Sequence, residues 1–581
     1  IFLKYTGTLD SACTITIGPN TVSKLWFIEN ATSGSQNIII KQGSGATITI
    51  ANGQTKAIYS DGAGSGGAMV DAFQDLAIPD LFIDDDLTLT SDSAVITFGA
   101  DGDTTLTHTD GSGLTLNSTN KLMFNDASQF IQGSSATVLS LGATDEIDLT
   151  ATAMDFNGTV TISGDTTLED GADLITATAG TSNVRIGVNA GNSIASGGNY
   201  NVAVGDEAGT AISTGDNNTF VGYASGDAVT TGTESVALGS NALSAAVGSD
   251  KNTALGAYAL RNDTEGESSV AVGHQALNAQ NFATATSAFN VAVGANAGVS
   301  VTTGIENTLI GALSGDALTD ADENVAVGYG ALSADTKGGQ SVAVGTFALL
   351  SQNFTTTTSS YNVAVGDRAG RVITTGQYNT LLGGLAGDGL TDADRNIAIG
   401  YQTLTTDDLG SRTVAIGAGA VFSQNYATAT DSHNVSIGDL SLFYNVTGVN
   451  NTFVGSAAGL GASGNSHSDN TGVGKSALGA ITTGVRNVAI GSLAGDAMTD
   501  AGSNVAIGYL SMTTNTSGSD NVALGRGTLE NFNVTTTTST FNVAIGHEAG
   551  NDITTGIRNI TIGGRAGDAL TDADYNVAIG T

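Results

Sequence analysis

The residues best suited to chemistry in this sequence are the carboxylates of an acidic motif that recurs along its second half. One copy is formed by Asp316, Asp320 and Asp322. Further copies lie at Asp388, Asp392 and Asp394 and at Asp568, Asp572 and Asp574, with a thinner version at Asp496 and Asp500. Clustered carboxylate oxygens are ligands that Ca²⁺ accepts. The spacing matches no calcium loop, however, and an Asp-rich corner also makes a turn soluble, so we expect no cofactor and keep Ca²⁺ as the alternative.

Other residue types offer little catalytic chemistry. None of the histidines has a metal-ligand spacing, and we expect a surface or turn role for each of the five: His108, His274, His433, His467 and His547. The single cysteine, Cys13, excludes a disulfide framework and a cysteine-ligated metal site. A polysaccharide-cleaving enzyme needs a unique cluster of acidic residues, whereas the acidic motif here is copied. We therefore expect that the protein is not an enzyme.

Aromatic residues in four longer repeat units are the third candidate. These units carry Thr-rich loops at residues 281–289, 353–361, 425–433 and 533–541. Three of the loops have an aromatic residue at their second position, at Phe282, Phe354 and Tyr426. Insertions on one side of a repeat protein are frequent binding surfaces, where exposed rings could stack on sugars of a receptor. The alternative, which we favour, is that these loop tips pack between protomers.

All of these candidates are positioned by a sequence repeat. The segment NVAVG at residues 201–205 returns with variations, and its closing glycine recurs 23 times between Gly187 and Gly580. Most of these glycines follow one another at i+17, and steps of 21 end at Gly294, Gly366, Gly438 and Gly546. Three of the shorter steps and one longer step together make a block that is itself repeated. A unit of this length accommodates two short strands and two turns, so we predict stacked coils with glycine at both corners to supply positive φ.

The positions before each column glycine predict a short strand. One residue before it stands Val, Ile or Leu, and three before it Val, Ile or Thr, which indicates a strand with one apolar face that we expect to be buried. Two residues before it Ala is most frequent, and four before it Asn dominates. We expect the Asn side chains to form amide ladders. We expect the small Ala-bearing face to pack against neighbouring chains, which predicts a homotrimer.

Composition and charge exclude several classes of protein. Asp and Glu outnumber Lys and Arg by 55 to 18, and the net charge is −37. Such a chain repels nucleic acid and anionic lipid headgroups, so we expect no nucleic-acid partner. The sequence has no apolar stretch of the 18 or more residues that a spanning helix needs, and we expect no membrane insertion.

The expected fold is all-β and has three regions. Residues 1–79 form an N-terminal β domain, with strands within 13–17, 24–28, 37–41 and 46–50 and with Trp26 and Phe27 in its core. Residues 80–180 form a β-rich shaft of short strands separated by Asp-Gly and Ser-Gly turns. Residues 181–581 form a long parallel β-roll or β-solenoid of about 17-residue coils, which we expect to be homotrimeric.

Two resemblances add to these expectations. The repeats at residues 341–345 and 504–508 resemble the head repeats of trimeric autotransporter adhesins. That resemblance covers about residues 181–581 and implies a left-handed parallel β-roll with three chains around one axis. The stretches at residues 38–73 and 87–130 are similar to the tail fibres of bacteriophages, particularly marine ones. Those fibres are Gly/Thr/Ser/Asp-rich, low in Pro and Cys, and homotrimeric.

The sequence therefore predicts a structural virion fibre, a phage tail fibre that forms an elongated trimeric rod and mediates or supports host-cell attachment. Its expected partners are itself, other virion tail or baseplate proteins and host surface glycans, and its expected location is the extracellular virion. The alternative is a bacterial surface adhesin of the trimeric autotransporter type, located at the bacterial cell surface.

Overall fold

The computed structural model is all-β, as predicted. It describes residues 1–74, 77–79, 81–89, 93–109, 113–116, 120–124, 126–135, 137–143, 147, 160, 163 and 179–581. Among these residues the one helix is a short 3-10 turn, η1 (Gly64–Gly66). The chain divides into two compact units, Ile1–Gly164 and Asp165–Thr581. Much of the region expected to form a shaft, including residues 148–159 and 164–178, lies outside the described residues.

The N-terminal unit begins with two small sheets that enclose a core. One sheet has the order β1–β3–β6–β7, with β1 (Phe2–Tyr5), β3 (Ser23–Asn30), β6 (Thr55–Asp61) and β7 (Met69–Asp71). The other has the order β2–β4–β5, with β2 (Cys13–Thr16), β4 (Ile38–Lys41) and β5 (Ile48–Ile50). Isoleucines dominate the core, among them Ile28, Ile40 and Ile58. The four strands expected from the sequence are confirmed.

One core prediction in this unit is wrong. Trp26 packs against the isoleucine core, but its neighbour Phe27 is 42% exposed. Successive side chains of a strand point to opposite faces, so the two rings cannot share one core.

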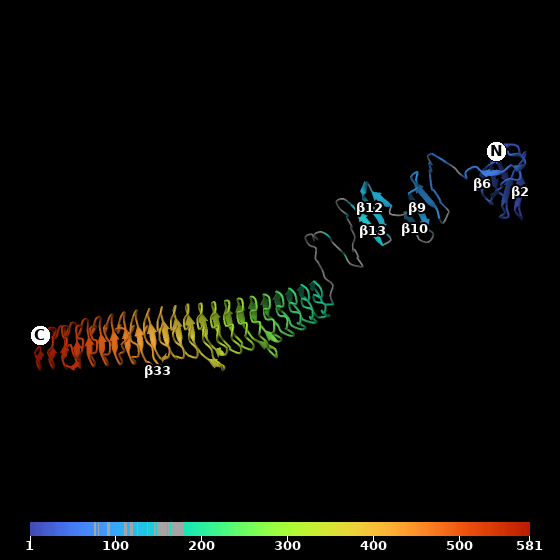
Figure 1. Ribbon diagram of the computed structural model, residues 1–581. Coiled ribbons are helices and arrows are strands. Elements are labelled where there is room, and N and C mark those ends of the chain that lie inside the picture. Colours follow the sequence, from blue (N-terminus) through green and yellow to red (C-terminus); the bar gives the residue numbers. More distant parts are fainter. Residues whose placement is uncertain are drawn as a thin grey trace. The chain divides into compact units, whose positions relative to one another are not determined.

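Two separate three-stranded antiparallel sheets follow (Figure 1). The first has the order β10–β9–β8, with β8 (Val95–Phe98), β9 (Thr104–Thr109) and β10 (Gly113–Leu116). The second has the order β11–β12–β13, with β11 (Lys121–Phe124), β12 (Asp126–Ser135) and β13 (Val138–Gly142).

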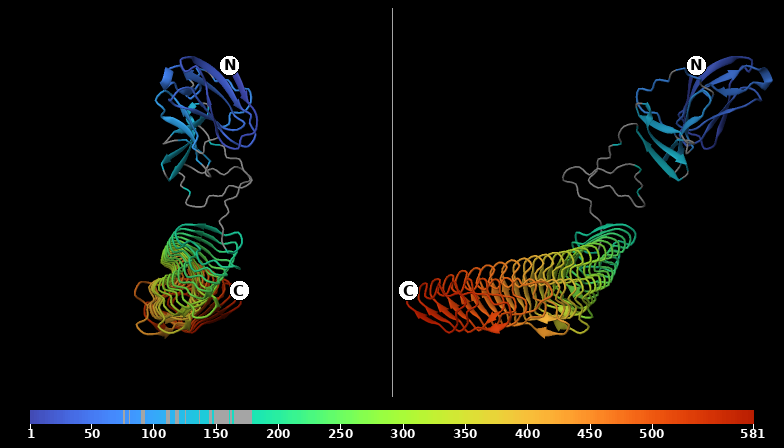
Figure 2. Two further views of the ribbon diagram at one scale, coloured as in Figure 1. Left: turned by 90° about the vertical axis from the view of Figure 1, so that its right-hand side faces the viewer. Right: turned by 60° about the vertical axis from the view of Figure 1, so that its left-hand side comes forward.

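The second unit is a β-solenoid whose main sheet contains 23 parallel strands, one per coil, stacked along a single rod (Figure 2). Neighbouring strands pair in strict register, for example Val325 with Val342 and Val327 with Val344. In chain order the strands are β14 (Val184–Ile186), β15 (Val202–Val204), β16 (Thr219–Val221), β17 (Val236–Leu238), β18 (Thr253–Leu255), β20 (Val270–Val272), β22 (Val291–Val293), β23 (Thr308–Ile310), β24 (Val325–Val327), β26 (Val342–Val344), β28 (Val363–Val365), β29 (Thr380–Leu382), β30 (Ile397–Ile399), β32 (Val414–Ile416), β34 (Val435–Ile437), β35 (Thr452–Val454), β36 (Thr471–Val473), β37 (Val488–Ile490), β38 (Val505–Ile507), β40 (Val522–Leu524), β42 (Val543–Ile545), β43 (Ile560–Ile562) and β44 (Val577–Ile579).

The four 21-residue coils add a short second sheet each. In each case the inserted loop forms a two-residue strand that pairs in parallel with the preceding coil. The pairs are β19 (Gly266–Glu267) with β21 (Thr286–Ser287), β25 (Gly338–Gly339) with β27 (Thr358–Ser359), β31 (Gly410–Ser411) with β33 (Thr430–Asp431), and β39 (Gly518–Ser519) with β41 (Thr538–Ser539).

The sequence analysis placed the Val, Ile and Leu face of each strand inside the coil and the Ala face outside, and the structure shows the opposite. In every strand of the main solenoid sheet except the terminal β14 and β44, the middle residue is buried and the residues on either side of it are not. Ala326 is fully buried, for example, whereas Ile310 is 39% exposed. So short a coil encloses little volume, and only the small column fits inside it. The prediction that the Ala column packs against another chain is therefore wrong.

The interior makes room for a large middle strand residue by having a glycine in another column. Where the middle strand residue is large, a glycine lies beside it in the coil. A Cβ on Gly226 would lie 2.7 Å from the Phe220 ring, and one on Gly315 would lie 2.8 Å from a Leu309 methyl group. Interiors tolerate little overpacking, which explains why a large middle residue occurs only where such a glycine lies beside it.

The two corner glycines of a coil are needed for different reasons. The column glycine after each strand has positive φ, as at Gly311 with φ 130°. The glycine of the second corner, such as Gly304, has no positive φ, which corrects the sequence prediction. A Cβ on Gly304 would instead collide with the carbonyl oxygen of Ala321 in the next coil.

The Asn column forms the predicted ladder, and it lies inside the coil. The backbone N–H of Asn324 donates to Oδ1 of Asn307 (3.0 Å), and Nδ2 of Asn307 donates to the carbonyl oxygen of Ala321 (2.8 Å). One amide therefore joins two successive strands and also braces the strand against the opposite corner. All of these groups are buried, so water does not compete for these hydrogen bonds in the folded coil.

We expect Asn307→Leu to destabilise its coils by about 2–4 kcal/mol. The substitution leaves a buried carbonyl and a buried N–H without a hydrogen-bond partner, and each such group costs about 1–3 kcal/mol. Hydrogen exchange of the amides around Asn307 measures the loss of protection. Thr308→Val, at the neighbouring outward position, is the matched control. Equal loss of protection in both variants would contradict the structural role of the ladder.

Candidate functional site

The three carboxylates of one acidic motif contact three different groups of the chain. Asp316 accepts a hydrogen bond from Ser333 (2.5 Å), Asp320 pairs with Lys337 (3.3 Å), and Asp322 accepts from the backbone N–H of residue 305 (2.8 Å). Within the described part of the chain, no group of three or more His, Cys, Asp or Glu side chains is placed to hold a metal ion. Each carboxylate of this copy thus has its own structural partner.

Asp322 shows what the motif does for the solenoid. Its carboxylate caps a backbone N–H of the preceding coil, and Asp394 and Asp574 do the same for residues 377 and 557 (2.7 and 2.8 Å). Around Asp320, partial burial opposes ionisation, but hydrogen bonds from Thr319 and Lys337 outweigh it and lower the pKa. The motif therefore joins successive coils at an exposed corner.

The three aromatic residues expected at loop tips lie inside their coils. Phe282, Phe354 and Tyr426 are 6%, 5% and 4% exposed. The Tyr426 hydroxyl donates to the carbonyl oxygen of Gly448 (2.8 Å), and burial raises the pKa of Tyr426. The rings fill the extra space that four inserted residues create, so they present no face to a sugar or to another chain. The position predicted for them is corrected accordingly.

These rings cover a buried polar network that the sequence analysis did not identify. Gln424 donates to Oδ2 of Asp407 (2.6 Å) and to the Thr413 hydroxyl (3.0 Å), and its Oε1 accepts from Asn434 (2.9 Å). Two other blocks repeat the arrangement with Asp263 and Gln280 and with Asp335 and Gln352. Burial raises the pKa of Asp263 and of Asp407.

The fourth block replaces this network by a different solution. Asn515 stands in the place of the buried Asp, and Phe532, one coil later, in the place of the Gln. The Asn515 side chain accepts a hydrogen bond from the Gly518 N–H (2.9 Å) and donates one to the Gly518 carbonyl (2.8 Å). This arrangement needs no Gln side chain as a partner. The amide ladder also continues through Asn521 here, where the other blocks have Ser or Thr. A comparison of the blocks in the sequence would have revealed this coupled change.

His467 corrects the expectation of a surface or turn role for every histidine. It is 1% exposed, its ring packs edge-on against Phe453, and its Nε2 has no hydrogen-bond partner. Burial lowers the pKa of His467 to about 4. It lies in the 19-residue step between Gly455 and Gly474, where extra residues enlarge the corner.

The most extensive surface feature is the outward face of the solenoid, formed by the first and third residues of the 23 strands. These 46 positions hold 40 Val, Ile or Leu and six Thr, and no charged residue. Leu238, Ile310 and Ile437 are 47%, 39% and 37% exposed. At about 4.8 Å between strands and about 3.3 Å per residue, the face measures roughly 105 by 10 Å, on the order of 1,000 Å². Monomeric soluble proteins rarely expose a continuous apolar patch of more than a few hundred Å².

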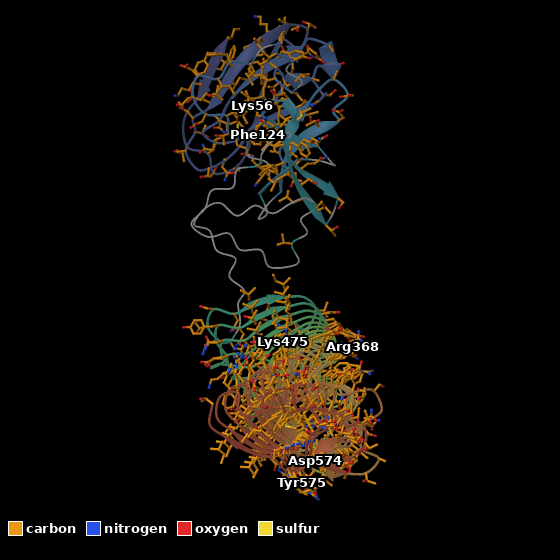
Figure 3. All side chains as sticks on the ribbon, turned by 90° about the vertical axis from the view of Figure 1, so that its left-hand side faces the viewer. Lys56, Phe124, Arg368, Lys475, Asp574 and Tyr575 are labelled. Carbon is orange, nitrogen blue, oxygen red and sulfur yellow. The ribbon has the colours of Figure 1, made fainter. Side chains whose placement is uncertain are left out.

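Charges are distributed unevenly around this face. We define the border positions as the fifth residue before each column glycine and the first two after it. In residues 179–581 the border positions hold nine Lys or Arg and ten Asp or Glu. All other positions of this region hold four Lys or Arg and 23 Asp or Glu. Arg368 and Lys475, on the outside of the solenoid, are two of the border cations (Figure 3). The border is thus nearly neutral, and the rest of the solenoid is strongly acidic.

Comparisons of the chain with protein-family models, with curated proteins and with solved structures find no match. Among the described residues, no helix is long and apolar enough to cross a membrane.

We expect Asn515→Asp to destabilise the last coils by about 3 kcal/mol at pH 7, because the carboxylate would be buried beside Phe532 without the Gln donor of the other blocks. Burial would raise the pKa of the new carboxyl in the folded state, so the cost is present above that pKa and is relieved as the pH falls toward 4. Urea unfolding at pH 7 and pH 4.5 measures this. Adding Phe532→Gln should restore part of the loss, and an equally large, pH-independent loss in both variants would contradict the account.

We expect the coils around His467 to lose stability on acidification. Because the pKa falls from 6.5 to about 4 on folding, the unfolded chain binds the proton more tightly. The stability contributed by the neutral ring is complete above pH 6.5 and declines by about 3 kcal/mol as the pH falls to 4. Hydrogen-exchange protection factors at pH 7 and pH 4.5 test this, with His467→Gln as the non-titrating control. Identical pH profiles for the two proteins would refute it.

Proposed function

We propose that this chain is a subunit of a structural virion fibre, a phage tail fibre, whose solenoids associate side by side through their outward faces. The single observation that carries the proposal is a rod of 23 coils with an uncharged apolar face along its whole length. A face on the order of 1,000 Å² is comparable with the roughly 800 Å² that each partner contributes to a standard protein interface. Its burial would stabilise the association, since apolar area removed from water is the dominant favourable term.

The charge distribution favours copies of the same chain as the occupants of this face. A border with nine cations and ten anions lets identical chains approach without net repulsion. The remaining acidic surface repels other copies, and so it directs contact to the outward face. We propose three copies around one axis, the number implied by the resemblance to trimeric autotransporter adhesins and to phage fibres.

In the proposed fibre, the rod separates a host-binding end from the particle. The solenoid alone extends roughly 105 Å at about 4.8 Å per coil, with its coils joined by buried hydrogen bonds. The fibre belongs to the extracellular virion, binds other virion tail or baseplate proteins, and supports attachment to host surface glycans. This role needs no cofactor and no catalytic residue.

The second candidate is a bacterial surface adhesin of the trimeric autotransporter type. The same outward face and the same trimer serve both proposals, so the solenoid does not discriminate between them. The gene and its neighbours discriminate between the two candidates. An adhesin of that type carries a signal peptide before the repeats and a membrane barrel after them, whereas the gene of a fibre protein lies among other virion genes.

We expect the chain to have three times its own mass by light scattering and to appear as a rod by electron microscopy. Combining Ile310→Asp with Ile490→Asp should reduce the mass to that of one chain, because each carboxylate would face its own copies across the interface. Thr303→Asp with Thr483→Asp, at exposed corner positions of the same solenoid, is the matched control and should remain assembled. A monomeric parent chain, or equal dissociation in both variants, would overturn the proposal.

A further inference from the structure

Among the residues that the structure describes, the two three-stranded sheets between residues 93 and 142 have no buried core of their own. Where the structure describes burial between residues 77 and 143, no residue is buried. Large apolar side chains are instead exposed, such as Phe98 (51%), Leu114 (69%) and Phe124 (51%). A three-stranded sheet needs an apolar face covered by another element to be stable in water. Something outside each sheet must therefore cover these residues.

The first sheet carries most of its large apolar residues on one face. Its register places Ile96, Leu106 and Leu116 in a row across the three strands. Beside the row is an open hollow of about 310 Å³, which Leu87 and Leu89 also line. The opposite face has Val95, Thr107 and Thr115 in the corresponding row. Only the first face offers an aliphatic row across all three strands, and His108 lies on that face beside the row.

The second sheet repeats this design. Its register places Leu122, Ile131 and Leu141 in a row across the three strands, and they are 51%, 38% and 48% exposed. On the opposite face, the Lys121 ammonium lies 3.5 Å from the centre of the Phe130 ring, which closes that face locally. Each sheet therefore has one open aliphatic row.

We propose that the aliphatic rows of the two sheets pack against the same rows of other copies of this chain, so that strands β8–β13 form a second inter-chain core. This inference rests on the proposed function, because association of the solenoids brings the copies together. Segments joined to an assembled solenoid meet at a high effective concentration, which favours contacts too weak to form between free chains.

The chemistry of the rows favours a second copy over an unrelated partner. Apart from Lys121 and Asp126, the described residues of the six strands carry no Asp, Glu, Lys or Arg. A charged partner would find no counter-charge on these faces, whereas an identical row of Ile and Leu matches them in width and polarity. Three-fold repetition of a narrow sheet also leaves no open apolar face, because each row is covered by its neighbours.

Neighbouring residues on β13 provide the experiment. Leu139 lies on the same face as Leu141, and Val138 on the opposite face, and they are 69% and 50% exposed. In the full chain with Cys13→Ser, each is replaced singly by Cys and the protein is oxidised. We expect Leu139→Cys to give at least ten times more inter-chain disulfide than Val138→Cys on a denaturing gel.

Two results would overturn the inference in an assembled chain. Equal cross-linking of the two variants would mean that the row is not a specific contact. Protection of β13 from hydrogen exchange without any inter-chain disulfide would mean that the two sheets cover each other within one chain. Light scattering of the same samples reports separately on the solenoid, so a monomeric mass identifies failure of the proposed function, and absence of the disulfide at a trimeric mass identifies failure of this inference alone.

Discussion

The structure of the solenoid depends on one constraint: each coil must close at the same place so that its strand stacks in register on the next. The buried amide of the Asn column enforces this, since it ties the strand to the opposite corner and to the following coil. Glycine at the corners lets the backbones of neighbouring coils approach each other. Everything that the coil encloses must then fit the cross-section that its short chain length sets, which is why Phe220 requires Gly226 beside it.

The same small cross-section explains the surface of the molecule. Because the interior accepts only the middle residue of each strand, the Val, Ile and Leu on either side of it must point outward. A sheet of 23 such strands is then apolar on both faces, like the buried parallel sheets of larger proteins. The proposed fibre follows from this geometry, since a second copy can cover what the coil itself cannot enclose.

The inserted coils show how the chain tolerates a departure from the regular coil length. Four extra residues enlarge the coil, and the space is filled from inside, by Phe282, Phe354 or Tyr426 over a buried carboxylate and Gln. The fourth block fills the space with Phe532 and keeps an uncharged Asn515. Two sets of residues thus solve one packing problem, and members of the two sets are not interchangeable one at a time, because each buried polar group needs its own partner.

The sequence by itself determined the repeat, the coil length, the all-β class and the amide ladder, because these follow from the spacing of Gly, Asn and β-branched residues along one dimension. It did not determine which strand face is inside. Alternation reveals two faces, and only the cross-section of the closed coil decides that Ala rather than Val is enclosed. Nor did it place Phe282, Phe354 and Tyr426, since a Thr-rich loop is equally compatible with a tip and with a filled corner. Left-handed bends at Glu306 and Leu313 were likewise invisible, because neither residue type favours positive φ and only stacking against neighbouring coils imposes it.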